Sequence, residues 1–243
     1  MRILIANANT TAAITDACAA VARQAAAPTT VIIGATPTFG PAVISTRVEN
    51  AIASHALLSM LAEHAGRVEA VVLAVSHDTA LEAARQLMPC PVLGMTEAGC
   101  LTACMVGGRF GILTLGQVAA YEDLVARHGL SARCAMVRGI AATPLDALRD
   151  PEGVAAMVLA EARAMAEGCD VIVLAGAALA GMDRRLQEDC PVPLLDGIAC
   201  AVKLLEGLVG LGLPKPRGGS YAAPMGRASM GLSPALDALL RGG

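Results

Sequence analysis

The sequence predicts an α/β protein made of two pseudo-symmetric lobes, each with a parallel sheet flanked by helices. Short apolar runs of strand length alternate with helical patterns along its 243 residues, and this alternation is typical of parallel sheets with helical crossovers. Two of the runs, at 71–75 and 171–175, have the same length, and each is followed by a short helix and a Cys-Pro-Val sequence. The two halves are therefore interpreted as an internal repeat of one α/β unit, and the two units are expected to meet at a cleft.

The expected elements follow the same scheme in both halves. In the first half we expect strands at 3–6, 30–34, 70–75 and 91–94, and helices at 12–25, 45–64, 79–88 and 96–105. In the second half we expect strands at 109–115, 133–138, 171–175 and 192–195, and helices at 117–128, 151–168, 183–189 and 197–209. The tail predicts a loop over 214–221 and a last helix over 233–240. Gly107 and Gly108 mark the expected boundary between the halves.

The composition excludes several classes of partner. A net charge of -3 gives no field that would attract a nucleic acid or an anionic membrane. The chain has no N-terminal signal pattern and no apolar run near the about 20 residues of a membrane span, so we expect a cytoplasmic protein. Its eight cysteines form no Cys-x-x-Cys pair and lack the spacing of metal ligands. We therefore expect reduced thiols, no metal and no cofactor.

The candidate site residues are those that follow each expected strand, because ligands of open parallel sheets bind outside the carboxyl ends of the strands. These residues are Asn7, Asn9, Thr10, Ser76, His77, Asp78, Thr114, Gln117, Gly176 and Ala177. His77 is the only one of four histidines at such a position, and imidazole titrates near neutral pH. A loop histidine without a function is the alternative.

Two of these segments also allow a structural interpretation. Asn9 and Thr10 could bind an anion together with the N–H groups of the following helix, or Thr10 or Thr11 could simply cap that helix. Asp78 could orient His77, but we favour a role as the N-cap of a helix that begins at Thr79.

Several motifs resemble the aspartate, glutamate and hydantoin racemase superfamily, most closely its hydantoin and allantoin racemase branch. They lie at 7–11 (Asn-Ala-Asn-Thr-Thr), 40–45 (Gly-Pro-Ala-Val-Ile-Ser), 92–98, 121–125, 196–213 and 221–222. The likeness covers nearly the whole chain. It implies two pseudo-symmetric α/β lobes with the active site in the cleft between them. It also implies that the C-terminal segment returns to the first lobe, which gives lobes of 1–107 plus about 214–243, and 108–213.

The family's catalytic cysteines are missing from this sequence. The resemblance places one cysteine at the end of the central strand of each lobe, and these positions hold Val75 and Gly176 here. A shifted alignment of the second position gives Leu179. The side chains of these residues cannot accept or donate a proton, and the sequence therefore argues against the two-cysteine mechanism of racemisation.

What remains is one titrating group and a shell of hydrogen-bond donors. We expect His77 and Ser76 to be catalytic, and we expect Asn9, Thr10, Thr114, Gly176, Ala177 and Tyr221 to bind a small-molecule substrate. A single base favours a hydrolase or lyase, acting by C–N hydrolysis, elimination, decarboxylation or tautomerisation on a small carboxylate or cyclic ureide. One alternative is a racemase or isomerase with a substituted base pair, in which Asp183 or Tyr221 reaches inward. Another alternative is a homologue that binds a ligand without catalysis. The sequence also leaves open whether the protein is a homo-oligomer.

Overall fold

The structure is a computed structural model that describes residues 1–224, 226 and 228–242. The strands are β1 (Arg2–Ala6), β2 (Val31–Ala35), β3 (Ala70–Leu73), β4 (Val92–Gly94), β5 (Phe110–Leu115), β6 (Cys134–Ile140), β7 (Val171–Ala175) and β8 (Leu194–Asp196). The helices are α1 (Ala12–Ala25), α2 (Arg47–His64), α3 (Leu81–Leu87), α4 (Met95–Val106), α5 (Ala119–Arg127), α6 (Pro144–Arg149), α7 (Pro151–Met165), α8 (Met182–Leu186), α9 (Gly197–Gly210) and α10 (Pro234–Leu240), with 3₁₀ turns η1 (Ala177–Leu179) and η2 (Gln187–Asp189). Among these described helices, none has both the length and the apolar character needed to cross a membrane.

The chain forms two compact units, and the first of them is made of two segments that are separate in the sequence. The first unit contains residues 1–94 and 202–243, and the second contains 95–201. Helix α4 therefore groups with the second unit although it follows β4. Gly99 lets α4 pack closely on β7, because a Cβ there would lie 2.7 Å from Val173 Cγ1. The boundaries expected from the sequence, after 107 and near 214, lie about one helix further along the chain.

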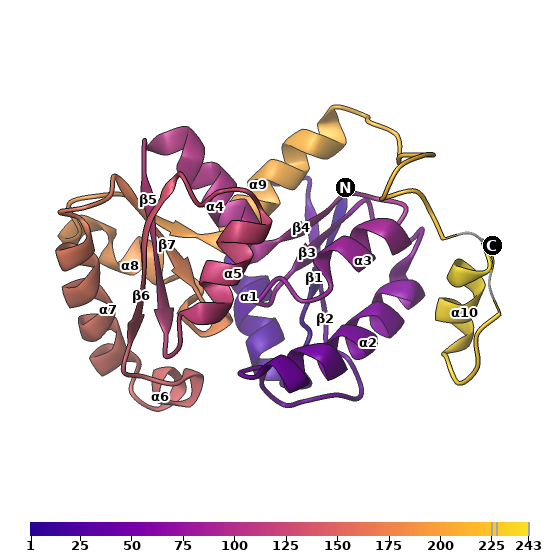
Figure 1. Cartoon of the computed structure of the whole chain (residues 1–243), viewed down its shortest axis with the longest axis horizontal. Coiled ribbons are helices and arrows are strands. Elements are labelled where there is room, and N and C mark those ends of the chain that lie inside the picture. The colour runs from indigo at the N-terminus through magenta and orange to yellow at the C-terminus, as the bar shows by residue number, and fades with distance from the viewer. Residues whose placement is uncertain (225, 227, 243) are drawn as a thin grey trace. The chain divides into compact units, whose positions relative to one another are not determined.

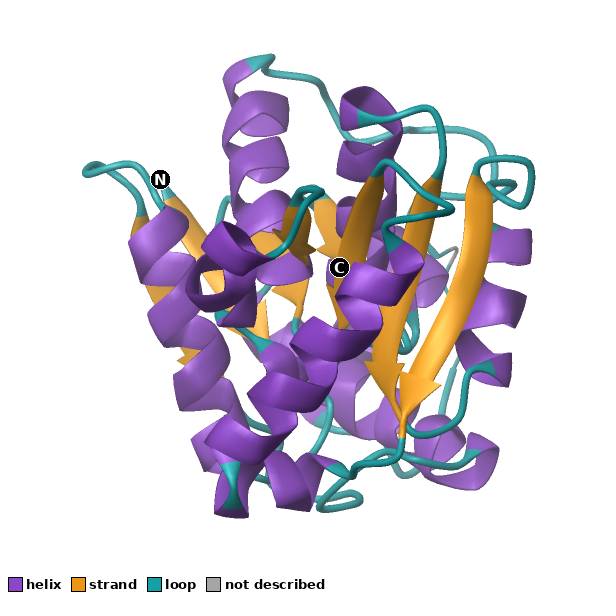
Figure 2. Ribbon diagram, turned by 90° about the vertical axis from the view of Figure 1, so that its left-hand side faces the viewer, coloured by secondary structure: helices purple, strands orange, loops and turns teal. Residues whose placement is uncertain are grey.

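Each unit holds one parallel sheet of four strands, and the strand order is the same in both (Figure 1). The order is β2-β1-β3-β4 in the first unit and β6-β5-β7-β8 in the second. Strands β3 and β7 are inner strands, which confirms that the apolar runs at 71–75 and 171–175 are central. Both are buried along their whole length, as expected for strands of a parallel sheet covered by helices on its faces. Figure 2 shows these helices against the strands.

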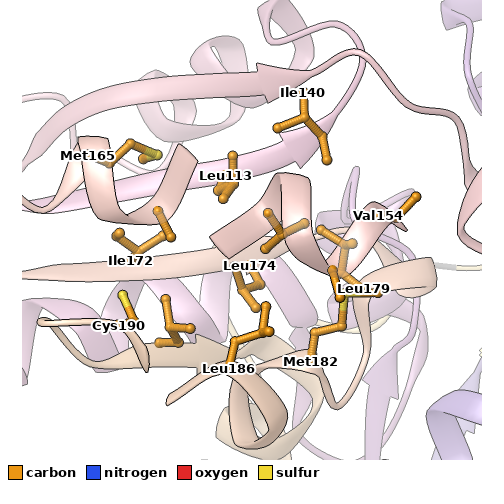
Figure 3. Close-up of a cluster of buried hydrophobic side chains, with 14 of the residues drawn as sticks. Leu113, Ile140, Val154, Met165, Ile172, Leu174, Leu179, Met182, Leu186 and Cys190 are labelled. Carbon is orange, nitrogen blue, oxygen red and sulfur yellow. The ribbon is translucent and has the colours of Figure 1, made fainter. Parts of the chain in front are cut away.

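One core cluster of the second unit is built from aliphatic side chains, methionine and cysteine. Leu113 of β5, Ile172 and Leu174 of β7 and Met165 of α7 are buried in one cluster (Figure 3). The described members of this cluster include no aromatic residue, whereas Phe110 and Tyr121 are buried in a second cluster of the same unit. Branched aliphatic side chains fill the space between sheet and helices, and this packing holds the strand ends in place.

Candidate functional site

The carboxyl ends of β1 and β3 bring two polar segments to one edge of the first sheet. The strands pair in parallel with Ala6 opposite Leu73. The Ala74 N–H donates to the Ala6 oxygen at 2.9 Å, which extends the pairing by one residue. The chain then leaves the sheet as residues 7–11 after β1 and 75–80 after β3. The predicted site residues on these two segments are Asn9, Thr10, Ser76 and His77.

Asn7 and Asn9 hold the first segment in one conformation. The completely buried Asn7 donates from Nδ2 to Asn9 Oδ1 and to Thr15 Oγ1, both at 3.0 Å, and accepts the Asn9 N–H at 3.1 Å. Asn9 Oδ1 also accepts the Thr11 N–H at 3.0 Å. These two donors fix the orientation of the Asn9 amide. Its Nδ2 donates to no acceptor in the described part of the protein, so it remains a donor for a ligand.

Thr10 and Thr11 tie the same segment to the loop that precedes α2. The Thr10 N–H donates to the Pro41 oxygen at 3.0 Å, and Thr11 Oγ1 donates to the Ala42 oxygen at 2.7 Å. Thr11 occupies the N-cap position of α1, but its side chain makes no capping hydrogen bond. The first turn of α1 also carries no acidic residue. Its N–H groups and the positive end of the helix dipole therefore favour a negatively charged group nearby.

His77 lies in a tight turn at the carboxyl end of β3. The Asp78 N–H donates to the Val75 oxygen at 3.0 Å, which places Ser76 and His77 at the two central positions of a β-turn. The imidazole is half-buried, and this burial lowers the pKa of His77 below its ordinary value of 6.5. A neutral imidazole can accept a proton, so the turn holds a candidate base at neutral pH.

The segment after His77 is strained. Asp78 and Ala80 have φ angles of 46° and 56°, and they are the non-glycine residues with positive φ in the described chain. Each such residue costs about 1–2 kcal/mol. The expectation that Asp78 caps a helix from Thr79 is wrong, because α3 begins at Leu81 and its N-cap is Ala80, without a side-chain capping bond. Asp78 is instead buried, with 2% of its surface exposed. Its carboxyl group occupies the space that a side chain at position 94 would need, and Gly94 leaves this space open.

In the second unit, the structure places Thr114, Gly176 and Ala177 around the ends of β5 and β7. Thr114 lies within β5, opposite Ala175, and is buried. Gly176 follows β7 with a φ of 151°, where an L side chain is strained although a Cβ would meet no closer neighbour than 3.6 Å. Its oxygen accepts the Leu179 N–H at 2.8 Å, and Ala177 opens η1. The backbone conformation of this strand end therefore favours glycine.

Two carboxyl groups of the second unit influence each other, Asp196 at the end of β8 and Asp183 in α8, and the sequence indicated only Asp183. Asp196, the last residue of β8, is 3% exposed and accepts the Ala199 N–H and the Gly181 N–H, both at 2.9 Å. Asp183 Oδ1 is buried without a hydrogen-bond partner in the described structure. Burial, and then the charge of Asp196, raises the pKa of Asp183 above 3.8. Burial also raises the pKa of Asp196, but its two N–H donors favour its ionised form.

The pKa values of both carboxyl groups are therefore raised, and in the described structure Asp183 Oδ1 is the oxygen of this pair that lacks a hydrogen-bond partner. Asp196 could have been recognised from its position directly before the glycine that opens the last long helix. The sequence pattern placed the end of the strand at 195, one residue too early.

Tyr221 is not brought to the carboxyl ends of β1 and β3. Its ring lies 6.0 Å from Arg85 Cζ, in a groove of about 260 Å³ that is lined by residues 89–93, which lead into and begin β4. Lys215 closes this groove and donates to the oxygens of Arg85, Gln86 and Met88. The groove is therefore built around the end of α3 and the start of β4.

The cysteines are free thiols, and two of them are strongly shifted in pKa. Burial raises the pKa of Cys90 and of Cys200 to about 11, so both are protonated at neutral pH and weak nucleophiles. Val75, in the turn before His77, is buried and apolar. Among the described residues, no group of three or more His, Cys, Asp or Glu side chains is arranged to hold a metal ion.

Comparison with known sequences gives one family over most of the chain. The family model described as Asp/Glu/Hydantoin racemase matches residues 3–205. A hydantoin racemase from Rhizobium meliloti is 32% identical over 236 residues, which cover 95% of this chain and 98% of the relative. A hydantoin racemase from Paenarthrobacter aurescens is 32% identical over 231 residues, which cover 92% of this chain and 98% of the relative.

Comparison with solved structures indicates the same family as the sequence comparison does. The allantoin racemase from Klebsiella pneumoniae has a TM-score of 0.91 and 33% sequence identity, and the match covers 98% of this chain and 99% of the other. A glutamate racemase from Francisella tularensis has a TM-score of 0.60 at 12% identity, with 98% of this chain and 93% of the other covered. The second likeness is one of fold alone.

We predict that the imidazole of His77 titrates below pH 6.5. Its pKa is lowered in the folded chain, so the unfolded chain binds the proton more tightly. The stabilising contribution is therefore present above the unfolded pKa of about 6.5 and is lost as the pH falls through the folded pKa. An NMR titration, with His77→Asn to assign the signal, measures this pKa. Urea unfolding of both proteins from pH 7.5 to 5 measures the loss of stability.

Comparison of the parent with His77→Asn also controls for titration of the other histidines. Burial also lowers the pKa of His64, and His64 is present in both proteins, so the difference between the two isolates His77. A His77 pKa at or above 6.5 would contradict the half-buried, neutral imidazole.

Proposed function

This chain belongs to the Asp/Glu/hydantoin racemase family, and on that premise we propose that it racemises a small cyclic ureide of the hydantoin or allantoin type by proton transfer. The observation that carries the proposal is the half-buried His77, which follows β3 at the sheet edge to which β1 also brings Asn9, whose amide is fixed by its own hydrogen bonds. The proposal assigns no cofactor.

The substrate class rests on the relatives and on the charge of the site segments. Relatives that resemble the chain over more than nine-tenths of its length are named hydantoin racemase and allantoin racemase. Residues 7–11 and 74–80 contain no Lys or Arg. Such segments suit an uncharged ring carbonyl better than a carboxylate, which favours a ureide over an acidic amino acid.

In the first step, neutral His77 takes the proton from the ring carbon next to the carbonyl group. The electron pair of the broken C–H bond moves toward the carbonyl, whose oxygen becomes an enolate. Asn9 Nδ2 and the uncapped N–H groups of α1 are the proposed donors to this oxygen. Ser76, on the same turn, is a further candidate donor. General-base catalysis of this kind contributes about 10²–10⁴-fold to a rate.

In the second step, Asp183 returns a proton to the other face of the carbon. Its unpartnered Oδ1 and its raised pKa suit a carboxyl group that holds a proton. The new C–H bond takes the proton of Asp183, while His77 keeps the proton that it removed. The reverse reaction then uses the same two groups with their protonation states exchanged.

A reaction with one base remains the second candidate. Hydrolysis, elimination, decarboxylation or tautomerisation by His77 alone is favoured by Val75 and Gly176, which carry no titrating side chain at the positions where the family resemblance implies cysteines. The names of the relatives favour racemisation instead. Thr10 and Thr114 enter either reaction as residues that position the strand ends. Gly176 and Ala177 would contribute backbone groups.

Incubation of one enantiomer of a 5-alkylhydantoin, and of allantoin, in D₂O tests the proposal. We expect the proton on the stereogenic carbon to be replaced by deuterium and the optical rotation to disappear, with the ring intact by NMR. His77→Asn should lower the turnover number about 10²–10⁴-fold with a smaller change in KM, because it removes titration and keeps the size of the side chain.

Ser76→Ala is the matched control, and we expect it to weaken binding while the pH dependence is kept. Ring-opened or eliminated products would favour the one-base reaction. Binding without any chemical change would favour a ligand-binding protein. If His77→Asn keeps parental turnover, the base lies elsewhere.

Asp183→Asn is expected to separate exchange from inversion. With His77 intact, the variant should still exchange the proton for deuterium on one face of the carbon, but the optical rotation should persist. Chiral chromatography combined with mass spectrometry measures both quantities in one sample. Equal losses of exchange and inversion would show that Asp183 is not the second proton donor. Asp189→Asn, on an exposed 3₁₀ turn of the same unit, controls for loss of a nearby carboxylate.

A further inference from the structure

Helix α3 begins later than its sequence pattern predicts. The pattern favours a helix over 79–88, and Ala80 is of the residue type with the highest helix propensity. In the structure the helix begins at Leu81, and Ala80 has a φ of 56° in place of a helical conformation. The local preference of the chain is therefore overridden by contacts with other parts of the first unit.

The contact that overrides it comes from α2. Thr79 Oγ1 donates to Asn50 Oδ1 at 2.6 Å, and Thr79 is 1% exposed. Asn50 is itself well anchored, since its N–H donates to the Thr46 oxygen at 3.0 Å. Thr46 and Glu49 form a capping box that fixes the start of the helix. A rigid helix end thus holds the residue that lies between the two strained positions.

A second contact holds the other side of the strained segment. Asp78 is buried with its carboxyl group over Gly94, in the space that any larger residue there would fill. The Leu81 N–H donates to the Asp78 oxygen at 3.1 Å, which closes a turn over Thr79 and Ala80. The segment therefore persists because β4 and α2 both constrain it, as strained backbone at a functional site requires.

We infer that Asn50 is a positioning residue, which holds the first turn of α3 unwound and so keeps His77 in its turn after β3. The inference rests on the role proposed for His77. Without the hydrogen bond from Thr79, residues 79 and 80 adopt the helical conformation that their sequence favours, and α3 grows toward its N-terminus. Asp78 and His77 precede this turn directly, so the imidazole is displaced from the edge where Asn9 lies. Asn50 acts through Thr79 and touches no substrate.

The variant Asn50→Ala tests this inference. We expect the turnover number to fall about 10- to 100-fold, the usual effect of a displaced catalytic group, with KM within about twofold of the parent. We expect the Cα chemical shifts of residues 79–81 to move to helical values. The melting temperature should fall only slightly, because release of the strain of Ala80 offsets part of the lost hydrogen bond. Asn50→Asp keeps the acceptor oxygen and should behave as the parent does.

A second substitution should restore activity. Glycine adopts positive φ without strain and disfavours a helix, so Asn50→Ala combined with Ala80→Gly should recover most of the turnover number and the parental shifts at 79 and 81. A side chain that merely contributed to stability would not be rescued in this way.

The outcomes that overturn the inference differ from those that overturn the proposed function. Unchanged shifts at 79–81 in Asn50→Ala would overturn it, whatever happens to the activity. A loss of activity that follows the melting temperature and is not rescued by Ala80→Gly would also overturn it. The shifts are measured without substrate, so they decide the question even if the protein does not act on ureides.

Discussion

The parallel pairing of β1 with β3 is the constraint on which the candidate site depends. The hydrogen bond from the Ala74 N–H to the Ala6 oxygen carries this pairing to the last residue of each strand. Asn9 and His77 must then leave the sheet at the same edge, although 67 positions separate their strand ends in the sequence. The second sheet repeats the order, so Thr114, Gly176 and Asp196 gather at its equivalent edge.

The burial of the titrating groups gives the site its chemical character. Burial lowers the pKa of His77, and burial beside Asp196 raises the pKa of Asp183. The family resemblance implies thiols for proton transfer at the ends of the central strands. The cysteines of this chain are poor candidates for that role, since the pKa values of Cys90 and Cys200 are raised to about 11. The chain keeps the fold of the family, with Val75 and Gly176 at the positions where the resemblance implies cysteines.

The sequence predicted those features of the fold that depend on local hydrophobic patterns and on the internal repeat. The strands, their alternation with helices and the central places of β3 and β7 follow from apolar periodicity and from the internal repeat. The position of His77 directly after β3 follows from the same pattern.

Other features depend on contacts that no local pattern encodes. The late start of α3 is imposed by Asn50, 29 positions before Thr79, and the burial of Asp78 is permitted by the absence of a side chain at Gly94. The pattern placed the end of β8 one residue early and so missed Asp196. Tyr221 was assigned from family resemblance, but it packs near Arg85, beside the start of β4. In each case a tertiary contact decides between local alternatives.

A crystal structure of His77→Asn with a bound 5-alkylhydantoin tests the central claim most directly. The account predicts that the ring carbon bearing the alkyl group lies about 3–3.5 Å from the side chain at position 77. The adjacent carbonyl oxygen should accept a hydrogen bond of about 2.9 Å from Asn9 Nδ2. A hydantoin whose ring carbon faces away from position 77, or which binds only in the groove beside Tyr221, would contradict the assignment of His77 as the base.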